Sequence, residues 1–324
     1  MTVAVRVHET GGPEVLRVEE VPVGEPGPGE VRLKQTAIGV NFVDVYRRTG
    51  LYQMPLPFIP GSEGAGIVTA VGPEVTELRP GDRVAYCTAP TGGYAAERLI
   101  EARLLVRLPE TIDDVTAAAS MLRGLTAAYL LRRTHVVKPG DTILVHAAAG
   151  GVGLIACQWA SHLGATVIGT VGSAEKAALA KANGCAHPIL YREEDFVARV
   201  KEITGGKGCD VVYDSVGKSV FPGSLDCIRP LGLWALFGQS SGSVPPLDLQ
   251  MLAQRGSLFA TRPTLFTYAA KREDLLALAD ELFSVLQSGA VKIKVGEKLP
   301  LAEAAEAHRR LEGRRTTGST ILVA

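Results

Sequence analysis

The chain has 324 residues, which predicts two domains rather than one small core. Lysine plus arginine equals aspartate plus glutamate, 34 of each, and this balance argues against electrostatic binding of nucleic acid as the main activity. Five scattered cysteines are typical of reduced thiols. Because no apolar run approaches the ~18 residues of a membrane span and no cleavage signal follows Met1, we expect a cytoplasmic enzyme or binding protein.

Residues 1 to about 120 are rich in short β-like runs separated by turn signals. The runs lie at residues 2–7, 30–37, 66–71 and 83–86, and Gly-Pro, Pro-Gly and Gly-Asp pairs punctuate this region. The pattern predicts an irregular, mainly β domain that forms a partly open barrel.

Residues 58–68, FIPGSEGAGIV, place one acid, Glu63, beside Ser62 in a glycine-rich stretch. A soft turn needs no acid there, and a metal site would use a histidine or a cysteine instead of a serine. The roles of Ser62 and Glu63 therefore depend on which ligand the rest of the chain binds.

From about residue 124, Ala-rich helical stretches alternate with short apolar strands. Helices are predicted at residues 151–163 and 174–182, the first with one apolar face. Strand–helix alternation of this kind indicates a doubly wound parallel sheet with helices on both faces. The predicted strands are residues 142–146, 166–170, 187–191, 210–214, 233–237 and 257–261.

The end of the chain does not continue this alternation. Residues 271–288 are predicted to be a helix, and strands at 291–297 and 318–323 flank another helix at 301–311. We expect this tail to return to the first domain and complete it.

The stretch TILVHAAAGGVGLIACQWA, residues 142–160, is the most informative part of the sequence. A strand runs into a small-residue turn and then into an amphipathic helix, which is the arrangement of a dinucleotide-binding fold. Gly150, Gly151 and Gly153 suit the sharp turn, the approach to a pyrophosphate and the close helix–strand packing, and the helix N-terminus offers N–H groups to phosphates. Ala148 replaces the first glycine of the strict pattern.

The end of the second strand favours NADP over NAD. An NAD site usually has an acid there, which binds the ribose 2′-hydroxyl. Gly172 and Ser173 occupy that place, and Lys176 follows one turn into the next helix, so that a 2′-phosphate is attracted rather than repelled. Tyr191, at the end of the third strand, is expected to pack beside the adenosine.

A zinc site is not predicted. A catalytic zinc needs about three converging Cys, His or carboxylate ligands, and a structural zinc usually shows closely spaced cysteines. The cysteines of this chain are scattered, and its six histidines show no ligand spacing. His146, directly before the glycine turn, is interpreted as structural.

Motifs along the whole chain resemble those of the zinc-free quinone oxidoreductases, the zeta-crystallin-like branch of the medium-chain dehydrogenase/reductase superfamily. The matching stretches are GVNFVDVYRRTGLY, FIPGSEGAGIV, GDRVAY, GGYAAE, LTAAYLL, PGDTILVHAAAGGVGLIACQWA, DVVYDSVG and GSLFATRP. Zinc-bearing relatives carry a histidine ligand where this chain has Ser62 and a cysteine ligand where it has Asn41. The resemblance therefore leaves Glu63 as a structural carboxylate rather than an acid catalyst.

The resemblance implies an N-terminal GroES-like domain and a Rossmann domain with a cleft between them. The GroES-like, catalytic domain is expected at residues 1–123, completed by 266–324, and the Rossmann, NADPH-binding domain at 124–265. The chain is expected to act as a homodimer, in which an edge strand in SLFATRP continues the sheet across two copies.

Carried over position by position, the resemblance implies a set of NADPH contacts. Near the nicotinamide and its ribose are Asn41, Tyr46, Thr126, Phe237, Gly238, Ser240 and Ser241; along the pyrophosphate are Ala149, Gly150, Gly151 and Val152; around the 2′-phosphate are Gly172, Ser173, Lys176 and Tyr191; on the adenine side are Ser215 and Gly217; and a late phosphate contact is Arg314.

The expected activity is metal-free reduction of a quinone by NADPH, through hydride transfer or single-electron steps. A quinone accepts a hydride readily, since the product is an aromatic hydroquinone, so correct positioning is the main requirement. Asn41, Tyr46 and Tyr52 are the catalytic candidates, because their polar groups are expected to hydrogen-bond the quinone oxygens and relay a proton from water.

Three alternatives remain open at this point. The first is an NADPH-dependent reductase of α,β-unsaturated ketones or aldehydes, which would need an acid for the α-carbon. The second is a zinc alcohol dehydrogenase, which Asn41 and Ser62 oppose. The third is a nucleotide-responsive RNA-binding or structural protein, for which the neutral net charge offers no support.

Overall fold

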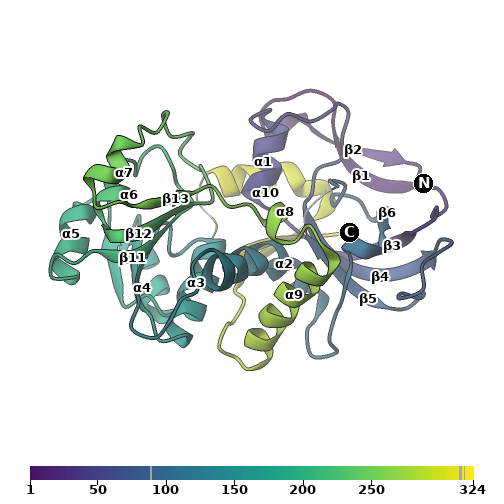
Figure 1. The fold of residues 1–324 in the computed structure, drawn as a ribbon. Helices are drawn as coiled ribbons and strands as arrows, with labels where there is room; N and C mark the ends of the chain where they lie inside the picture. Colours follow the sequence, from purple (N-terminus) through teal and green to yellow (C-terminus); the bar gives the residue numbers. More distant parts are fainter. Residues whose placement is uncertain (88–89, 314–315, 317) are drawn as a thin grey trace. The chain divides into compact units, whose positions relative to one another are not determined.

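The computed structural model describes residues 1–87, 90–313, 316 and 318–324. The chain divides into two compact units, coloured along the sequence in Figure 1. The first unit comprises Met1–Arg123, Ala269–Phe283 and Ile293–Ala324, and the second comprises Gly124–Tyr268 and Ser284–Lys292.

The described part of the first unit is built around a seven-stranded sheet and a separate antiparallel pair of strands. The sheet order is β14-β15-β3-β4-β5-β7, and β6 pairs with β3. Because β15 pairs with β3, the end of the chain joins a sheet that the N-terminal third of the chain begins. The strands are β1 (Thr2–Val7), β2 (Leu16–Val21), β3 (Glu30–Gly39), β4 (Glu63–Val71), β5 (Arg83–Cys87), β6 (Glu97–Glu101), β7 (Val106–Arg107), β14 (Val295–Pro300) and β15 (Ser319–Val323).

Alternation along β3 explains how this sheet encloses its core. Val31 and Leu33 are completely buried, whereas Lys34 is exposed, as expected for a strand with one face inward. A second core surrounds Ile38 and joins β1, β15 and helix α10. The helices within or entering the unit are α1 (Phe42–Arg48), α2 (Asp114–Tyr129), α9 (Arg272–Gln287) and α10 (Ala304–Glu312), with short 3-10 turns at Pro13–Val15, Ala102–Leu104 and Leu301–Glu303.

The second unit contains a parallel sheet with six described strands, in the order β10-β9-β8-β11-β12-β13. In chain order this is 3-2-1-4-5-6, the doubly wound order, and the direction of winding reverses between β8 and β11. Ligands of such sheets bind beyond the carboxyl ends of the strands at this reversal. The strands are β8 (Thr142–Val145), β9 (Thr166–Val171), β10 (His187–Leu190), β11 (Cys209–Asp214), β12 (Ile228–Leu236) and β13 (Phe259–Thr261).

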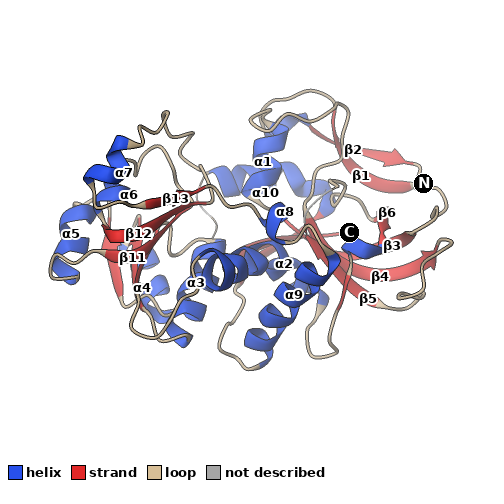
Figure 2. Cartoon of the chain, in the orientation of Figure 1, coloured by secondary structure: helices blue, strands red, loops and turns tan. Residues whose placement is uncertain are grey.

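Helices cover both faces of this sheet (Figure 2). One face packs an apolar core around Leu144, Val212 and Trp234 against α5, α6 and α7, and α3 and α4 lie along the other face. None of the described helices combines the length and hydropathy that a membrane crossing requires. The helices are α3 (Gly151–His162), α4 (Ala174–Ala182), α5 (Phe196–Ile203), α6 (Gly223–Asp226), α7 (Gln250–Gln254) and α8 (Leu265–Tyr268), and a π-helical turn follows α2 at Leu130–Thr134.

The predicted elements agree with the structure where local patterns set their limits and differ from it where strand pairing does. The predicted helix at 174–182 has the observed limits, whereas the predicted strand at 291–297 is displaced, since β14 begins at Val295. Pairing decides that start, because the register with β15 begins at Ser319 opposite Val295. The predicted strand at 257–261 is shorter for a similar reason, since only Phe259–Thr261 pair with β12.

Candidate functional site

Residues Ala147–Val152, which comprise the turn after β8 and the first two residues of α3, are called the phosphate turn below. Gly150 is the N-cap of α3, and no side chain in the described chain caps this helix. The Gly150 N–H is bound to the Ala147 carbonyl, 2.8 Å away. The first turn of α3 therefore keeps backbone N–H groups available for an anion. The predicted pyrophosphate residues Ala149, Gly150, Gly151 and Val152 all lie in this turn.

Close packing explains why the turn needs Gly153 but tolerates Ala148. A Cβ on Gly153 would overlap the Ala147 carbonyl oxygen and lie 2.8 Å from the backbone of Ala148. The left-handed conformation falls on Ala147, at φ 55°, whereas Ala148 is held by a backbone bond to Thr170 on β9. A glycine is thus not required at Ala148, although the strict motif would place one there.

The carboxyl ends of β9 and β10 bring the predicted 2′-phosphate residues together. Ser173 caps α4 by accepting a bond from the Lys176 backbone N–H, at 3.3 Å. A Cβ on Gly172 would lie 2.9 Å from the Tyr191 hydroxyl, so the two residues are neighbours. Tyr191 remains 41% exposed. Gly172, Ser173, Lys176 and Tyr191 therefore form one group without an acid at the position that selects NAD.

Two further predicted groups interlock at the ends of β11 and β12. The Ser240 N–H donates to the Ser215 carbonyl at 3.1 Å, and the Ser241 N–H donates to the Val216 carbonyl at 2.9 Å. A Cβ on Gly238 would lie 2.7 Å from the Ser215 carbonyl oxygen. The structure thus joins six predicted cofactor residues in one pair of loops: Ser215, Gly217, Phe237, Gly238, Ser240 and Ser241.

The remaining predicted cofactor residues lie elsewhere. Thr126 is a buried residue of α2 in the second unit. Asn41 and Tyr46 belong to the first unit. Arg314, the predicted late phosphate contact, lies outside the described residues.

Asn41 and Glu63 are bonded to each other inside the first unit. Asn41 precedes α1, and its Nδ2 donates to Glu63 Oε1 at 2.7 Å. Glu63 begins β4, is completely buried, and accepts a second bond from the Leu122 backbone N–H at 2.7 Å. Burial raises the pKa of Glu63 to about 7, although Arg123 and these hydrogen bonds favour its charged form.

Ser62 bridges two buried side chains of opposite charge, Asp44 and Arg47. Its hydroxyl donates to Asp44 Oδ1 at 2.6 Å and accepts from Arg47 Nη1 at 2.6 Å. Burial raises the pKa of Asp44 and lowers that of Arg47, and each charge partly offsets the shift of the other. The residues Asn41, Asp44, Arg47, Ser62 and Glu63 are called the buried cluster below.

The other catalytic candidates lie on α1 and the turn after it. The rings of Tyr46 and Tyr52 meet edge to face with centroids 5.3 Å apart, and the Tyr52 N–H donates to the Tyr46 carbonyl at 3.0 Å. The structure therefore brings these two rings together, one on α1 and the other in the turn after it.

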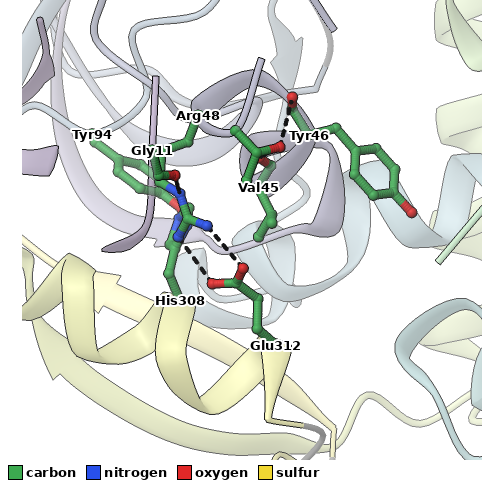
Figure 3. A network of polar contacts seen from close by, with 8 residues as sticks. Gly11, Val45, Tyr46, Arg48, Tyr94, His308 and Glu312 are labelled. Carbon is green, nitrogen blue, oxygen red and sulfur yellow. Dashed lines mark hydrogen bonds and ion pairs between the residues drawn. The ribbon is translucent and has the colours of Figure 1, made fainter. Parts of the chain in front are cut away.

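A polar network holds the carboxyl end of α1 (Figure 3). Arg48, almost completely buried, makes a two-pronged ion pair with Glu312 at 2.8 and 2.9 Å and donates to His308 Nδ1 at 3.2 Å. His308 Nε2 lies 2.9 Å from the Tyr94 hydroxyl, and burial lowers the pKa of His308 to about 3. The Tyr46 ring points away from this network, so the network fixes the helix without using the phenol.

Comparison with known proteins identifies the family. Residues 151–280 match the model "Zinc-binding dehydrogenase", and residues 27–110 match "Alcohol dehydrogenase GroES-like domain". The quinone oxidoreductase of Pseudomonas aeruginosa is 54% identical over 97% of each chain. The crystal structure of Escherichia coli quinone oxidoreductase complexed with NADPH has a TM-score of 0.97 and 49% identity over 99% of this chain and 100% of that one.

The chain belongs to the quinone oxidoreductase family. The predicted family, the Rossmann and GroES-like fold class, the enzyme class and the NADPH cofactor are confirmed by these matches. A 2-haloacrylate reductase of Burkholderia is also 49% identical, over 100% of this chain and 99% of its own.

The zinc that one family model names does not suit the residues around Ser62. A cation there would face the Arg47 guanidinium, which already binds the Ser62 hydroxyl. Asn41 offers an amide and Ser62 a hydroxyl where zinc prefers thiolate or imidazole. Among the described residues there is also no group of three or more His, Cys, Asp or Glu side chains placed to hold a metal ion.

The burial of Asp44 and Arg47 on either side of Ser62 is a feature that sequence reasoning missed. A signal was present, because FVDVYRR places these two charges three residues apart on a short helix. The sequence does not show that both charges face the interior, since that follows from the contact with Ser62.

Proposed function

We propose that this member of the quinone oxidoreductase family reduces a quinone with NADPH and without a metal. The observation that supports the proposal is the phosphate turn, where the N-terminus of α3 has no side-chain cap and where Gly153 packs so closely that a Cβ would overlap the Ala147 carbonyl oxygen. Such a turn brings backbone N–H groups against a pyrophosphate.

The second unit binds the cofactor through groups that select its parts. Ala149, Gly150, Gly151 and Val152 bind the pyrophosphate with their backbone. Gly172, Ser173, Lys176 and Tyr191 surround the 2′-phosphate; Ser215 and Gly217 lie on the adenine side; and Phe237, Gly238, Ser240, Ser241 and Thr126 border the nicotinamide end. From the first unit, Arg314 is proposed to add a phosphate contact. When bound, NADPH supplies the hydride that the quinone accepts.

The first unit positions the quinone and handles the proton. One N–H of the Asn41 amide is bound to Glu63, which fixes the orientation of the amide, and we propose that its second N–H contacts the ligand. Tyr46 and Tyr52 supply phenolic hydroxyls that donate to the quinone oxygens. Because a hydroquinone needs a proton as well as the hydride, these phenols relay it from water.

The reaction proceeds without a Lewis acid, since the aromaticity of the product already drives hydride acceptance. The Arg47 guanidinium supports this proposal. It binds the Ser62 hydroxyl, so its positive charge would repel a zinc ion at that position. Metal analysis of the active protein tests it directly, and activity that depends on stoichiometric zinc would contradict it.

A second candidate substrate class is an activated alkene conjugated to a carbonyl. The identity of 49% to a 2-haloacrylate reductase favours this candidate. Such a substrate needs a proton at the α-carbon, and in this chain Tyr46 or Tyr52 would have to supply it.

The deciding experiment is steady-state oxidation of NADPH and of NADH with a panel of quinones, enones and 2-haloacrylates. We expect quinones to have the highest kcat/KM and NADPH to be preferred over NADH. Tyr46→Phe and Tyr52→Phe should lower kcat with quinones more than the affinity for NADPH. Turnover of haloacrylates but not of quinones would favour the second candidate instead.

We also propose the domain limits, assembly and compartment. Residues 1–123 with 266–324 form the catalytic domain and residues 124–265 the NADPH-binding domain.

β13 lies at the end of the strand order of its sheet, and its Phe259 is 62% exposed. These two features support pairing of this edge with a second copy in a homodimer. Light scattering tests the assembly, and Phe259→Lys is expected to give monomers. The five free, buried cysteines are consistent with a reducing cytoplasm.

A further inference from the structure

Asp214, the last residue of β11, is bonded to both loops that contain predicted cofactor residues, although no role was predicted for it from the sequence. Its side chain is completely buried. Its Oδ1 accepts bonds from the Val216 and Gly217 N–H groups at 2.8 and 2.9 Å. Its backbone carbonyl accepts bonds from the Phe237 and Gly238 N–H groups at 2.8 and 3.2 Å. One residue therefore holds both loops, 215–217 and 237–241.

The second carboxylate oxygen of Asp214 begins a chain of hydrogen bonds through the interior. Oδ2 accepts from Trp234 Nε1 at 3.2 Å and from the Ser224 hydroxyl at 3.3 Å. The Ser224 oxygen lies 3.0 Å from His146 Nε2, and His146 Nδ1 lies 2.9 Å from the Thr170 hydroxyl. Ser224, His146 and Thr170 are all buried.

The direction of these bonds follows from the chemistry of the carboxylate. Because a carboxylate only accepts, Ser224 donates its proton to Asp214 or to the Val220 carbonyl, and not to His146. His146 Nε2 must then donate to Ser224, and its Nδ1 accepts from Thr170. Burial lowers the pKa of His146, against the effect of Asp214, which suits this neutral imidazole.

Thr170 connects the chain to the phosphate turn. Its hydroxyl oxygen accepts from the Ala147 backbone N–H at 3.4 Å, and its carbonyl accepts from the Ala148 N–H at 3.1 Å. A continuous path of hydrogen bonds therefore runs from the phosphate turn at β8 to the loop after β11, on either side of the point where the sheet reverses its winding.

We propose that Asp214 is a positioning residue for NADPH, which holds loops 215–217 and 237–241 in the binding conformation and couples them through Ser224, His146 and Thr170 to the phosphate turn. The inference rests on the proposed function, in which these loops bind the cofactor. A carboxylate is required because its two oxygens face four donors, the Val216, Gly217 and Trp234 N–H groups and the Ser224 hydroxyl, and an amide of the same size has only one accepting oxygen.

Asp214→Asn is the direct test, in the full-length protein. The amide has one accepting oxygen, so its NH2 must face either the loop N–H groups or the donors Trp234 and Ser224. We expect the Kd for NADPH, followed by its fluorescence, to rise about tenfold or more, since hydrogen bonds to a buried charge are lost. The value of kcat at saturating NADPH should change much less.

Asp210→Asn is the matched control. Asp210 lies at the other end of β11, where it accepts bonds from the Thr142 N–H at 2.7 Å and Arg229 Nε at 2.6 Å. This variant should lose stability but keep the wild-type Kd for NADPH. Asp214→Asn that is folded and binds NADPH as tightly as the wild type would overturn the proposal.

Thr170→Val and Thr170→Ser test the coupling and keep the proposal falsifiable if Asp214→Asn does not fold. The valine removes the hydroxyl between His146 and Ala147 and should raise the Kd for NADPH several-fold, whereas the serine should restore it. Equal affinity of both variants and the wild type would overturn the coupling. Wild-type protein that does not bind NADPH would instead refute the proposed function itself.

Discussion

The phosphate turn of the second unit is made of backbone and small side chains, whereas the buried cluster of the first unit is made of charged and amide side chains. In the turn, Gly150 and Gly153 permit close contacts and a helix N-terminus supplies the polar groups. In the cluster, the polar groups come from Asn41 and Asp44 at the start of α1 and from Glu63 on β4.

The difference predicts which property each region controls. Burial of a backbone site costs little free energy, because the helix already orders its N–H donors. A change there should therefore affect NADPH binding before it affects stability. The cluster contains charges that are stable only as pairs, so a change there should affect folding first. The following variants test this contrast.

Arg47→Ala should give the largest effect, on stability. It leaves the Asp44 carboxylate buried without its cation, and we expect a loss of about 3–5 kcal/mol in the free energy of unfolding. Urea denaturation followed by circular dichroism measures it.

Arg79→Ala is the control for that variant. The Arg79 side chain is 83% exposed and pairs with Asp82, and such surface pairs contribute about 0–1 kcal/mol. A similar loss for both variants would show that burial of the charge in the cluster does not matter.

Gly153→Val should reduce NADPH binding by about 100-fold, or ~2.8 kcal/mol. Its Cβ would overlap the Ala147 carbonyl and force α3 away from the phosphate turn. Isothermal titration with NADPH measures the change.

Gly205→Val serves as the matched control. Among the described residues no atom lies within 4 Å of a Cβ built there, so the substitution costs only the strain of a positive φ. It should lower stability without changing the affinity for NADPH. Wild-type affinity of Gly153→Val would contradict the role of the turn.

Lys176→Ala should raise the Kd for NADPH about tenfold, or ~1.4 kcal/mol, and leave that for NADH nearly unchanged. The reason is loss of a cation beside the 2′-phosphate, which only NADPH carries. Lys181→Ala, further along α4, is the control and should affect neither coenzyme. Equal weakening of both coenzymes by Lys176→Ala would refute the predicted 2′-phosphate contact.

Glu63→Gln should change how stability depends on pH. The native pKa of Glu63 is raised to about 7 from an ordinary value of 4.5, so its proton stabilises the native state below the ordinary pKa, and this stabilisation is lost as pH rises through 7. Between about pH 6 and pH 8 the wild type should therefore lose ~1 kcal/mol more than the variant. Parallel curves of unfolding free energy against pH would contradict this.

Much of the fold was accessible from local patterns. The alternation of strands and helices after residue 124 predicted the parallel sheet, because period and turn residues are properties of neighbouring positions. The displaced strand at 291–297 shows the limit of such patterns. Its observed start at Val295 is set by pairing with Ser319, and no local pattern encodes that partner.

The candidate site shows the same division. The glycine turn and the missing acid after β9 are read directly from consecutive residues, so Gly150, Gly172 and Lys176 could be selected from sequence. The roles of Asp214 and Thr170 could not, because both are ordinary polar residues until β9 and β11 bring them to opposite sides of His146.

The sequence by itself was enough to predict the family, the glycine turn before α3 and the missing acid after β9, because each depends on residue types at fixed short spacing. Only the tertiary structure decided which polar side chains are buried together. Glu63 meets Asn41 across 22 positions, and Asp44 meets Ser62 across 18. Burial strengthens such contacts and shifts their pKa values, and burial is a property of the folded chain.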